Sequence, residues 1–350
     1  MKVEKSIQKA HDGFVTKIAF TPWDEGKHYI SASADKSVKV WSTETDELLF
    51  TQAGCHAMGI NDFCFTKNPN EIMTVSSDRT AKFWNVDFEG QKLDEVRTAT
   101  LSEADSEQYK ENVDKQVLAA LFNKEADCSM AVTLNSDIQV WKDQSVTPET
   151  TIRGHNSYVN KVASFKHQFL VTGDNSARAL MWDPKTGNVT RSESHFQGKI
   201  AVNTIACNSD NVFAFFGDAS IMKYCLAEDG QSLKAEGDFV KKHVSFAQAI
   251  ATNDHLYVLY NDKSLEILKT DDLSSVANFD QASIGKDELS AIALAGNELW
   301  VSDNKGNLHI LDASTLALVE GVELKTANGH PGLCLAASHD GSLVAVGDNK

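Results

Sequence analysis

Two stretches of the sequence repeat one pattern: residues 31–41 read SASADKSVKVW, and residues 74–84 read TVSSDRTAKFW. Each stretch places a strand rich in Ser and Thr before an Asp-containing turn and a second strand that ends in Trp. The two terminal tryptophans are 43 residues apart. A histidine precedes each stretch, His11 in the first case and His56 in the second. The chain therefore contains a repeating unit.

The unit returns along the chain with decreasing fidelity. It recurs as AVTLNSDIQVW at 131–141 and as TGDNSARALMW at 172–182, and later units carry Tyr224, Leu268 and Leu311 at the Trp position. A last unit begins near residue 329. Repeats of this length, made of short alternating strands, are typical of four-stranded propeller blades. We predict an all-β fold, a β-propeller with seven full blade units plus a partial eighth.

The charge balance limits the classes of partner. The 350 residues include 33 Lys and Arg and 49 Asp and Glu, so the formal net charge is −16. Nucleic acids and anionic membrane surfaces attract basic proteins, so we expect neither as a partner. Residues 1–13 lack the apolar stretch of a signal peptide, and no stretch of 18 apolar residues indicates a transmembrane helix. The six scattered cysteines are typical of reduced thiols in a cytoplasmic protein.

The sequence lacks the common signatures of catalysis and cofactor binding. Gly-rich phosphate loops, the HExxH pattern and paired Cys/His spacing are all missing. The recurring His, Ser and Asp have the composition of a hydrolase triad, but a catalytic site has no reason to repeat in unit after unit. We therefore expect no enzyme activity, no catalytic or metal-binding residues and no cofactor.

The repeated residues resemble those of the WD-repeat family, and the resemblance covers nearly the whole chain. It implies a buried, hydrogen-bonded tetrad in each blade, made of a loop His, a strand Ser or Thr, a turn Asp and a strand Trp. Such a set satisfies an indole N–H and fixes an imidazole tautomer in the interior. The implied tetrads are His11, Ser33, Asp35 and Trp41 in the first unit, His56, Ser76, Asp78 and Trp84 in the second, and His155, Thr172 and Trp182 in the fourth.

Two choices in these tetrads remain open at the level of sequence. Ser31 and Thr74 are alternatives to Ser33 and Ser76, because both hydroxyl residues of each pair lie in the same strand. In the fourth unit Asp174 lies two positions from the expected turn Asp, so we leave it out of the tetrad.

The order of sound and degenerate units resembles the actin-interacting protein 1 family, which contains two propellers. The string Asp114-Lys115-Gln116-Val117 precedes a degenerate unit, and Ile152-Arg153-Gly154-His155 restarts the pattern, as in that family. The resemblance implies a monomer associated with the cytoskeleton in the cytoplasm, with actin and cofilin as partners, that promotes disassembly of cofilin-decorated filaments. The alternative is a generic WD-repeat scaffold or adaptor in a multiprotein complex. The sequence assigns no partner-binding residues.

The restart suggests a division of the chain into 1–148, with units one to three, and 149–350, with units four to seven and the partial eighth. These parts belong to one closed propeller or to two propellers, and the chain corresponds to a fragment of such a protein or to a shortened relative. Residues 86–116 are rich in acids. We interpret them as a solvated insertion or as an acidic arm that contacts a basic partner.

Overall fold

The fold is described from a computed structural model of residues 1–350. The structure describes residues 10–99, 116–124, 127–134, 137–142, 145–155, 157–166, 168–191, 200–240, 246–279, 288–319, 324–326, 329–338 and 340–348. Within them, secondary structure is entirely β, with thirty strands in eight antiparallel sheets. Seven sheets have four strands and the eighth has two. This agrees with the predicted seven full blades and a partial eighth.

The first four blades follow the chain order. Blade 1 contains β1 (Val15–Phe20), β2 (His28–Ser33), β3 (Val38–Ser42) and β4 (Leu48–Gln52). Blade 2 contains β5 (Ile60–Phe65), β6 (Glu71–Ser76), β7 (Ala81–Asp87) and β8 (Lys92–Ala99). Blade 3 contains β9 (Val117–Asn123), β10 (Cys128–Thr133), β11 (Asp137–Lys142) and β12 (Thr150–Arg153). Blade 4 contains β13 (Val159–Phe165), β14 (Phe169–Asp174), β15 (Ala179–Asp183) and β16 (Asn188–Arg191).

The remaining blades keep the same order. Blade 5 contains β17 (Val202–Cys207), β18 (Asn211–Phe216), β19 (Ser220–Leu226) and β20 (Leu233–Val240). Blade 6 contains β21 (Phe246–Ala251), β22 (His255–Tyr260), β23 (Leu265–Lys269) and β24 (Ser275–Asn278). Blade 7 contains β25 (Leu289–Ala295), β26 (Glu298–Asp303), β27 (Asn307–Asp312) and β28 (Leu324–Lys325). Blade 8 contains β29 (Gly332–Ala337) and β30 (Val344–Asp348).

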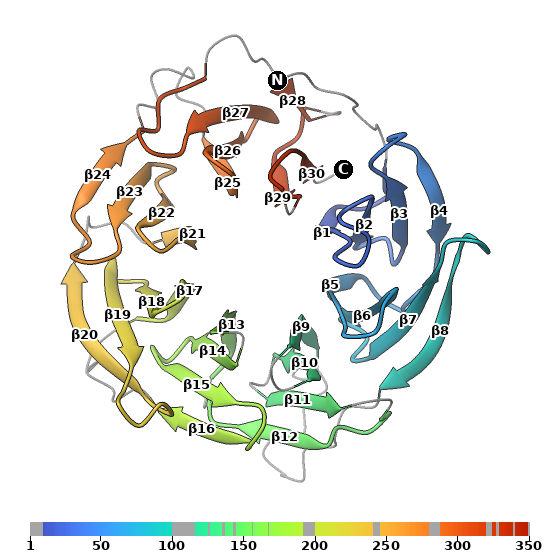
Figure 1. The fold of residues 1–350 in the computed structure, drawn as a ribbon, viewed down its shortest axis with the longest axis horizontal. Coiled ribbons are helices and arrows are strands. Elements are labelled where there is room, and N and C mark those ends of the chain that lie inside the picture. The colour runs from blue at the N-terminus through green and yellow to red at the C-terminus, as the bar shows by residue number, and fades with distance from the viewer. Residues whose placement is uncertain are drawn as a thin grey trace.

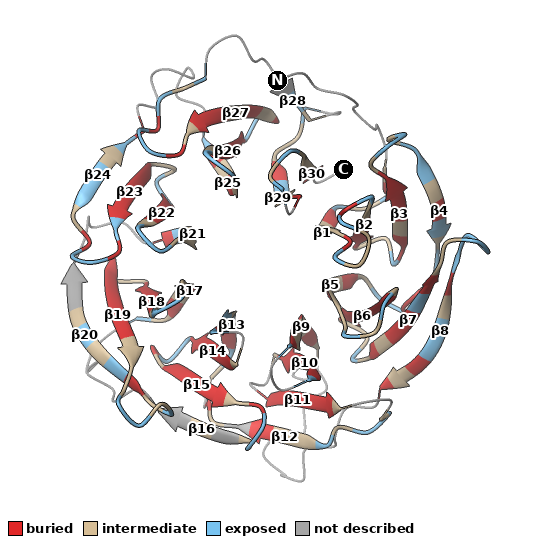
Figure 2. Cartoon of the chain, in the orientation of Figure 1, coloured by how far each residue is buried: buried red, intermediate tan, exposed pale blue. Residues whose placement is uncertain are grey.

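The eight sheets stand around one ring, with the first strand of each blade nearest the centre (Figure 1). Strand β29 lies beside both β25 and β1, so blade 8 joins blade 7 to blade 1. Burial is greatest in the second and third strands of the blades, whereas the outer strand β24 is mostly exposed and β4 is mixed (Figure 2). The second strands β6 and β10 are buried along their whole length, and their apolar residues are interspersed with Ser and Thr.

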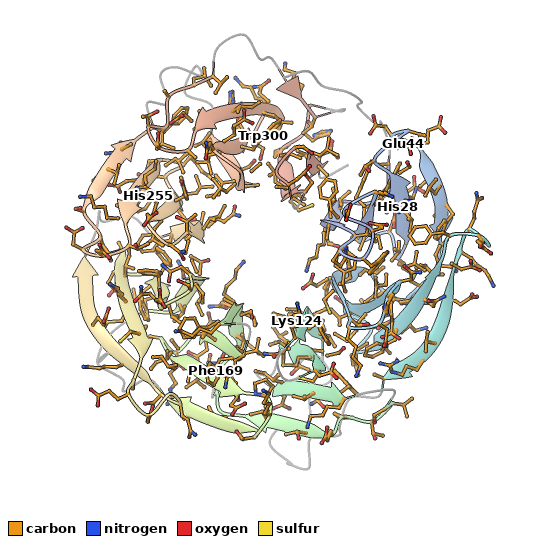
Figure 3. The ribbon with its side chains drawn as sticks, in the orientation of Figure 1. His28, Glu44, Lys124, Phe169, His255 and Trp300 are labelled. Atoms are coloured by element: carbon orange, nitrogen blue, oxygen red, sulfur yellow. The ribbon has the colours of Figure 1, made fainter. Side chains whose placement is uncertain are left out.

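Apolar side chains fill the spaces between neighbouring blades. Phe169 belongs to the cluster shared by blades 4 and 5, and Trp300 to the cluster shared by blades 7 and 8 (Figure 3). Because each blade buries one face against the next, a single blade has no complete core of its own. The energy that holds the ring comes mainly from these interfaces.

Each of the eight inner strands carries a β-bulge directly after its first residue. At three blade interfaces the bulged residue donates a hydrogen bond to the carbonyl of the first residue of the next inner strand. These bonds run from Asn61 to Val117 at 2.7 Å, from Asn160 to Val202 at 3.0 Å and from Ser290 to Gly332 at 3.2 Å. A bulge changes the direction in which a side chain leaves the strand, so that it no longer follows the regular alternation between the two faces. This explains how these residues reach the neighbouring blade.

The register shows which residues replace Trp in the degenerate units. All three of these residues, Tyr224, Leu268 and Leu311, are buried. Each pairs with the second residue of the preceding strand, just as Trp41 pairs with Tyr29. The Trp position therefore keeps the same register in the sheet even where the residue is no longer Trp. A large apolar residue there is enough to fill the blade interface.

Two sequence expectations differ from the structure. Within 86–116, residues 92–99 are not an insertion: they form β8, the fourth strand of blade 2, with Leu93, Arg97 and Ala99 turned inward. Residues 100–115 lie outside the described part of the chain. Strand β12 follows residue 148 in sequence but pairs with β11 in blade 3, so sequence units and blades are out of phase. The division into 1–148 and 149–350 as domains stays a prediction.

Candidate interaction face and buried tetrads

The tetrad of blade 1 is a chain of hydrogen bonds. The indole Nε1 of Trp41 donates to Ser31 Oγ at 2.9 Å, and Ser31 Oγ lies 2.8 Å from His11 Nε2. On its other side, His11 Nδ1 lies 3.0 Å from Asp35 Oδ2. Because Ser31 accepts the indole proton, its own proton points to Nε2, and the Nδ1 proton of His11 points to Asp35. His11, Ser31 and Trp41 are all buried.

Blade 2 repeats the arrangement with Thr in place of Ser. Trp84 Nε1 donates to Thr74 Oγ1 at 2.8 Å, and His56 Nε2 lies 2.8 Å from the same hydroxyl. His56 Nδ1 lies 3.1 Å from Asp78 Oδ2. Both Asp35 and Asp78 also accept a hydrogen bond from a hydroxyl two residues further on, that of Ser37 in blade 1 and of Thr80 in blade 2.

Blade 4 has the same network, with Asp174 as its carboxylate. The Nδ1 atom of His155 lies 2.7 Å from Asp174 Oδ2, and its Nε2 atom lies 2.5 Å from Thr172 Oγ1. The indole Nε1 of Trp182 donates to the same Thr172 hydroxyl. Asp174 is the last residue of β14 and not a turn residue, which is why the sequence spacing left it out. Its side chain still reaches His155, because Thr172 and Asp174 lie on the same face of the strand.

The structure assigns the strand hydroxyl of the tetrads to Ser31 and Thr74, which corrects the choice of Ser33 and Ser76. Tyr29 is the direct partner of Trp41 in the sheet, so the indole reaches diagonally to Ser31, two residues along β2. Ser33 lies two residues further still. The hydroxyls of Ser33 and Ser76 instead donate to backbone carbonyls that precede the inner strands, those of Phe14 at 3.0 Å and Gly59 at 2.8 Å.

Blades 3 and 7 depart from the pattern in two different ways. In blade 3, Ala131 lies ten residues before Trp141, where a hydroxyl is expected, and the buried Trp141 Nε1 finds no hydrogen-bond partner in the described part of the chain. In blade 7, Asp303 ends β26 as Asp174 ends β14, and its Oδ2 lies 2.9 Å from His309 Nε2. Here the histidine comes from the third strand, β27. The separation of Asp303 and His309 matches no other unit, so repeat alignment does not find this pair.

Burial and hydrogen bonding set the charge states in the tetrads. Burial is the largest influence on the pKa of His11 and lowers it, despite the neighbouring Asp35 carboxylate. Burial alone raises the pKa of Asp35, but hydrogen bonds from Ser37 and the proximity of His11 outweigh it, so this pKa lies below its usual range. In Asp78 the effect of burial is likewise outweighed, by hydrogen bonds from His56 and Thr80. In blade 1, a neutral His11 imidazole beside an ionised Asp35 carboxylate results.

The tetrads position the loops on one face of the ring. We call it the top face and define it as the face where the inner strands begin. Asp35 Oδ2 accepts the backbone N–H of Asp12 at 2.9 Å, and Asp78 Oδ2 accepts that of Ala57 at 2.8 Å. These bonds fix the loop backbone shortly before β1 and β5. The buried residues singled out by the sequence therefore support a surface and are not themselves exposed to a partner.

The turn between the second and third strands lies on the same face. In six blades, its first residue donates a backbone hydrogen bond to the residue that precedes the inner strand. The donor and acceptor pairs are Ala34 and Phe14, Ser77 and Gly59, Leu134 and Gln116, Asn175 and Tyr158, Gly217 and Ala201, and Asn304 and Glu288. Loops held by a rigid scaffold in this way are a usual location of binding surfaces.

The described residues give no sign of a metal site or a membrane span. Among them, no group of three or more His, Cys, Asp or Glu side chains is arranged to hold a metal ion. In the same part of the chain, no helix has the length and apolarity needed to cross a bilayer.

Comparison with known proteins agrees with the repeat analysis. The WD40 family model, described as "WD domain, G-beta repeat", matches residues 2–42, 47–85 and 146–183. The chain is 24% identical over 348 residues to WD repeat-containing protein 1 of Gallus gallus, covering 97% of this chain and 53% of that protein. The homologue from Xenopus tropicalis gives the same identity and coverage. The chain thus spans about half the length of these relatives.

Other similarities extend the comparison. Apoptotic protease-activating factor 1 of Rattus norvegicus is 26% identical over 272 residues, which cover 73% of this chain and 20% of that protein. Among solved structures, the computationally designed Ika8 protein superposes with a TM-score of 0.77 at 19% identity, covering 98% of this chain and 96% of that one. This last likeness concerns the fold alone. The chain is a β-propeller, and three of its segments match the WD40 repeat.

Proposed function

We propose that this chain is a non-enzymatic protein-interaction propeller that binds actin filaments together with cofilin and promotes their disassembly. The observation that carries the proposal is the alignment with WD repeat-containing protein 1, which is actin-interacting protein 1, over nearly all of this chain. The order of sound and degenerate units in the sequence supports the same relationship. The proposed role places the chain with the actin cytoskeleton in the cytoplasm.

The structure is consistent with a binding role through its top face. The tetrad carboxylates hold the loops before β1 and β5, so a partner meets a surface that is already ordered. Preorganised loops lose little conformational entropy on binding. The His, Ser and Asp of each tetrad are occupied by one another and by Trp, which fits a structural role better than a catalytic one.

Co-sedimentation with actin filaments, with and without saturating cofilin, tests the binding step. The proposal expects the chain to pellet with cofilin-decorated filaments and to remain in the supernatant with bare filaments. Circular dichroism and gel filtration of the same sample establish that it is folded and monomeric. A folded sample that stays in the supernatant in both cases contradicts the proposal.

The second candidate is a scaffold or adaptor in another multiprotein complex. The match to apoptotic protease-activating factor 1 over 73% of the chain favours it, because this chain is similar to a part of a protein with a different name. Failure to pellet with decorated filaments moves the assignment to this second function.

A further inference from the structure

Blade 8 has an open strand edge. Among the described residues it contains only β29 and β30, whereas each of the other seven blades continues from its second strand to a third and a fourth. The second strands β6, β10 and β14 are buried along their whole length, but in β30 only Gly347 is buried. Strand β30 lies nearer the centre of the ring than the flanking outer strands β28 and β4 (Figure 1). An unpaired edge of this kind is a template for strand addition.

Strand β30 has the same register as the second strands of the complete blades. Its last residue, Asp348, pairs with the first residue of β29, as Ser33, the last residue of β2, pairs with the first residue of β1. The positions of β30 therefore match those of β2 one by one. Val346 corresponds to Ser31, whose hydroxyl accepts the indole proton of Trp41. We call this place in each second strand the hydroxyl position.

Two backbone N–H groups of β30 face the open edge. In blade 1, the N–H of Ser33 points toward the third strand, since it donates to the carbonyl of Ser37 at 3.2 Å. The direction of the N–H groups alternates along an antiparallel strand, so those two and four residues earlier in β2 point the same way. Their counterparts in β30 belong to Val346 and Val344. An added antiparallel strand can therefore pair with β30 as β3 pairs with β2.

The residue at the hydroxyl position is related to the residue at the Trp position of the third strand. Where the hydroxyl position holds Ser or Thr, in blades 1, 2 and 4, the third strand carries Trp. Blades 6 and 7 have Val258 and Val301 there, and their third strands carry Leu268 and Leu311. In blade 3, which has Ala there, the Trp indole has no acceptor within the described part of the chain. Because blade 8 has Val346, Leu suits an added strand better than Trp.

Packing constrains the residues that precede the Trp position. Three residues before it, every complete blade has a buried apolar side chain: Val38, Ala81, Ile138, Ala179, Ile221, Leu265 and Leu308. Directly before it, every complete blade except blade 5, which has Lys223, carries an apolar residue. An added strand should therefore have the order apolar, variable, apolar, Leu. Val344 already packs against the cluster shared by blades 7 and 8, so a Leu opposite it extends an existing apolar interface.

We propose that the open edge of β30 binds an extended segment of a partner protein, which adds as the antiparallel third strand of blade 8 and has this order of residues. Main-chain hydrogen bonds to β30 supply affinity, and the contact of the Leu with Val344 supplies selectivity. A linear segment fits this edge better than a second ring does, because β30 lies inside the outer strands (Figure 1). The inference goes beyond the proposed function, since it does not depend on actin as a partner.

A peptide with the sequence of residues 305–313, KGNLHILDA, is the probe, because blade 7 also has Val at the hydroxyl position. Fluorescence anisotropy of the labelled peptide with the whole chain should show saturable binding, and hydrogen exchange at Val344 and Val346 should slow. A methyl group on the backbone nitrogen of the peptide's His309, which faces β30 in the proposed register, should weaken binding at least about tenfold. Methylation of the next nitrogen, that of Ile310, which faces away, is the matched control and should leave the affinity unchanged.

A paired exchange of side chains tests the register. A peptide in which Leu311 is replaced with Trp should bind about tenfold more weakly, because its buried indole N–H lacks an acceptor. The variant Val346→Thr should recover most of this loss, since its hydroxyl takes the place of those of Thr74 and Thr172. Val276→Thr makes the same change on β24, the outer strand of a complete blade, and should leave the affinity for both peptides unchanged.

Further measurements distinguish the other possible occupants of the edge. Binding of the peptide only after removal of residues 1–9 would assign the edge to a segment of the same chain. A dimer that the peptide dissociates, measured by analytical ultracentrifugation, would assign it to a second copy. Either result overturns the proposal, as would equal binding of the two methylated peptides. Circular dichroism establishes that each variant is folded, and a folded parent chain that does not bind the peptide also overturns it.

Discussion

Among the residues that the structure describes, the buried indole nitrogen of Trp141 has no hydrogen-bond partner, because Ala131 lies where blades 1, 2 and 4 have a hydroxyl. Ser31, Thr74 and Thr172 lie at the equivalent position and accept the indole proton of their own blade. A buried N–H without an acceptor costs free energy relative to its hydrated state in the unfolded chain. Blade 3 therefore contains a defect that a single substitution should repair.

Replacing Ala131 with Thr should stabilise the protein by about 1 kcal/mol, because the new hydroxyl accepts the Trp141 proton. Ala131→Val has nearly the same shape without the hydroxyl and is the matched control. Urea unfolding should give a higher midpoint for the Thr variant than for the Val variant. The difference should vanish in a Trp141→Phe background; equal midpoints for Thr and Val would contradict the assignment.

The tetrad assignment predicts energetic coupling between Ser31 and Trp41. In a double-mutant cycle of Ser31→Ala and Trp41→Phe, the coupling energy should be about 1 kcal/mol, because each substitution removes the same hydrogen bond. The corresponding cycle with Ser33→Ala should be additive within the error of such measurements, since Ser33 bonds to the backbone carbonyl of Phe14. Coupling to Ser33 and not to Ser31 would assign the tetrad hydroxyl to Ser33.

Stability should fall as the solution is acidified, in two windows. The lowered pKa of His11 means that the unfolded chain takes up a proton below its ordinary value of 6.5 before the folded chain does, so stability declines as the pH drops through that range. The lowered pKa values of Asp35 and Asp174 add a second loss below their ordinary value of 3.8. Thermal melting between neutral and acidic pH measures both. His11→Gln should flatten the upper window, and an unchanged slope would count against a neutral, buried His11.

Strand β8 carries a buried charge that a solvated insertion would not have. Arg97 is 8% exposed, lies 3.6 Å from Glu71 and stacks 3.5 Å above the ring of Phe83. Arg97→Ala should cost about 3 kcal/mol, because it leaves the Glu71 carboxylate buried without its counter-charge. The matched control is Lys92→Ala on the exposed end of the same strand, which should cost little. Similar small losses for both variants would mean that β8 is not an integral part of blade 2.

The fold was predictable because the repeat is carried by large residues with few tolerated alternatives. Trp41 and Trp84 mark equivalent strands by identity, and Tyr224, Leu268 and Leu311 keep the spacing after the identity is lost. A blade interface requires bulk at that point and little else, so the position survives substitution. The strand character of residues 92–99 was obscured by acids, which an outer strand tolerates on its solvent side.

The details of the site were less accessible from sequence. Ser31 and Ser33 lie on one face of one strand, and only the diagonal reach of Trp41 in the actual register separates them. Asp174 enters its tetrad from a strand end, and His309 enters from another strand altogether.

Fluorescence imaging of single actin filaments measures the proposed filament disassembly. Filaments saturated with cofilin would be observed before and after addition of the folded chain, with bare filaments as the control. The chain should speed the loss of polymer from cofilin-decorated filaments and leave bare filaments unchanged. An identical rate of loss with and without the chain, under conditions where cofilin coats the filaments, would contradict it.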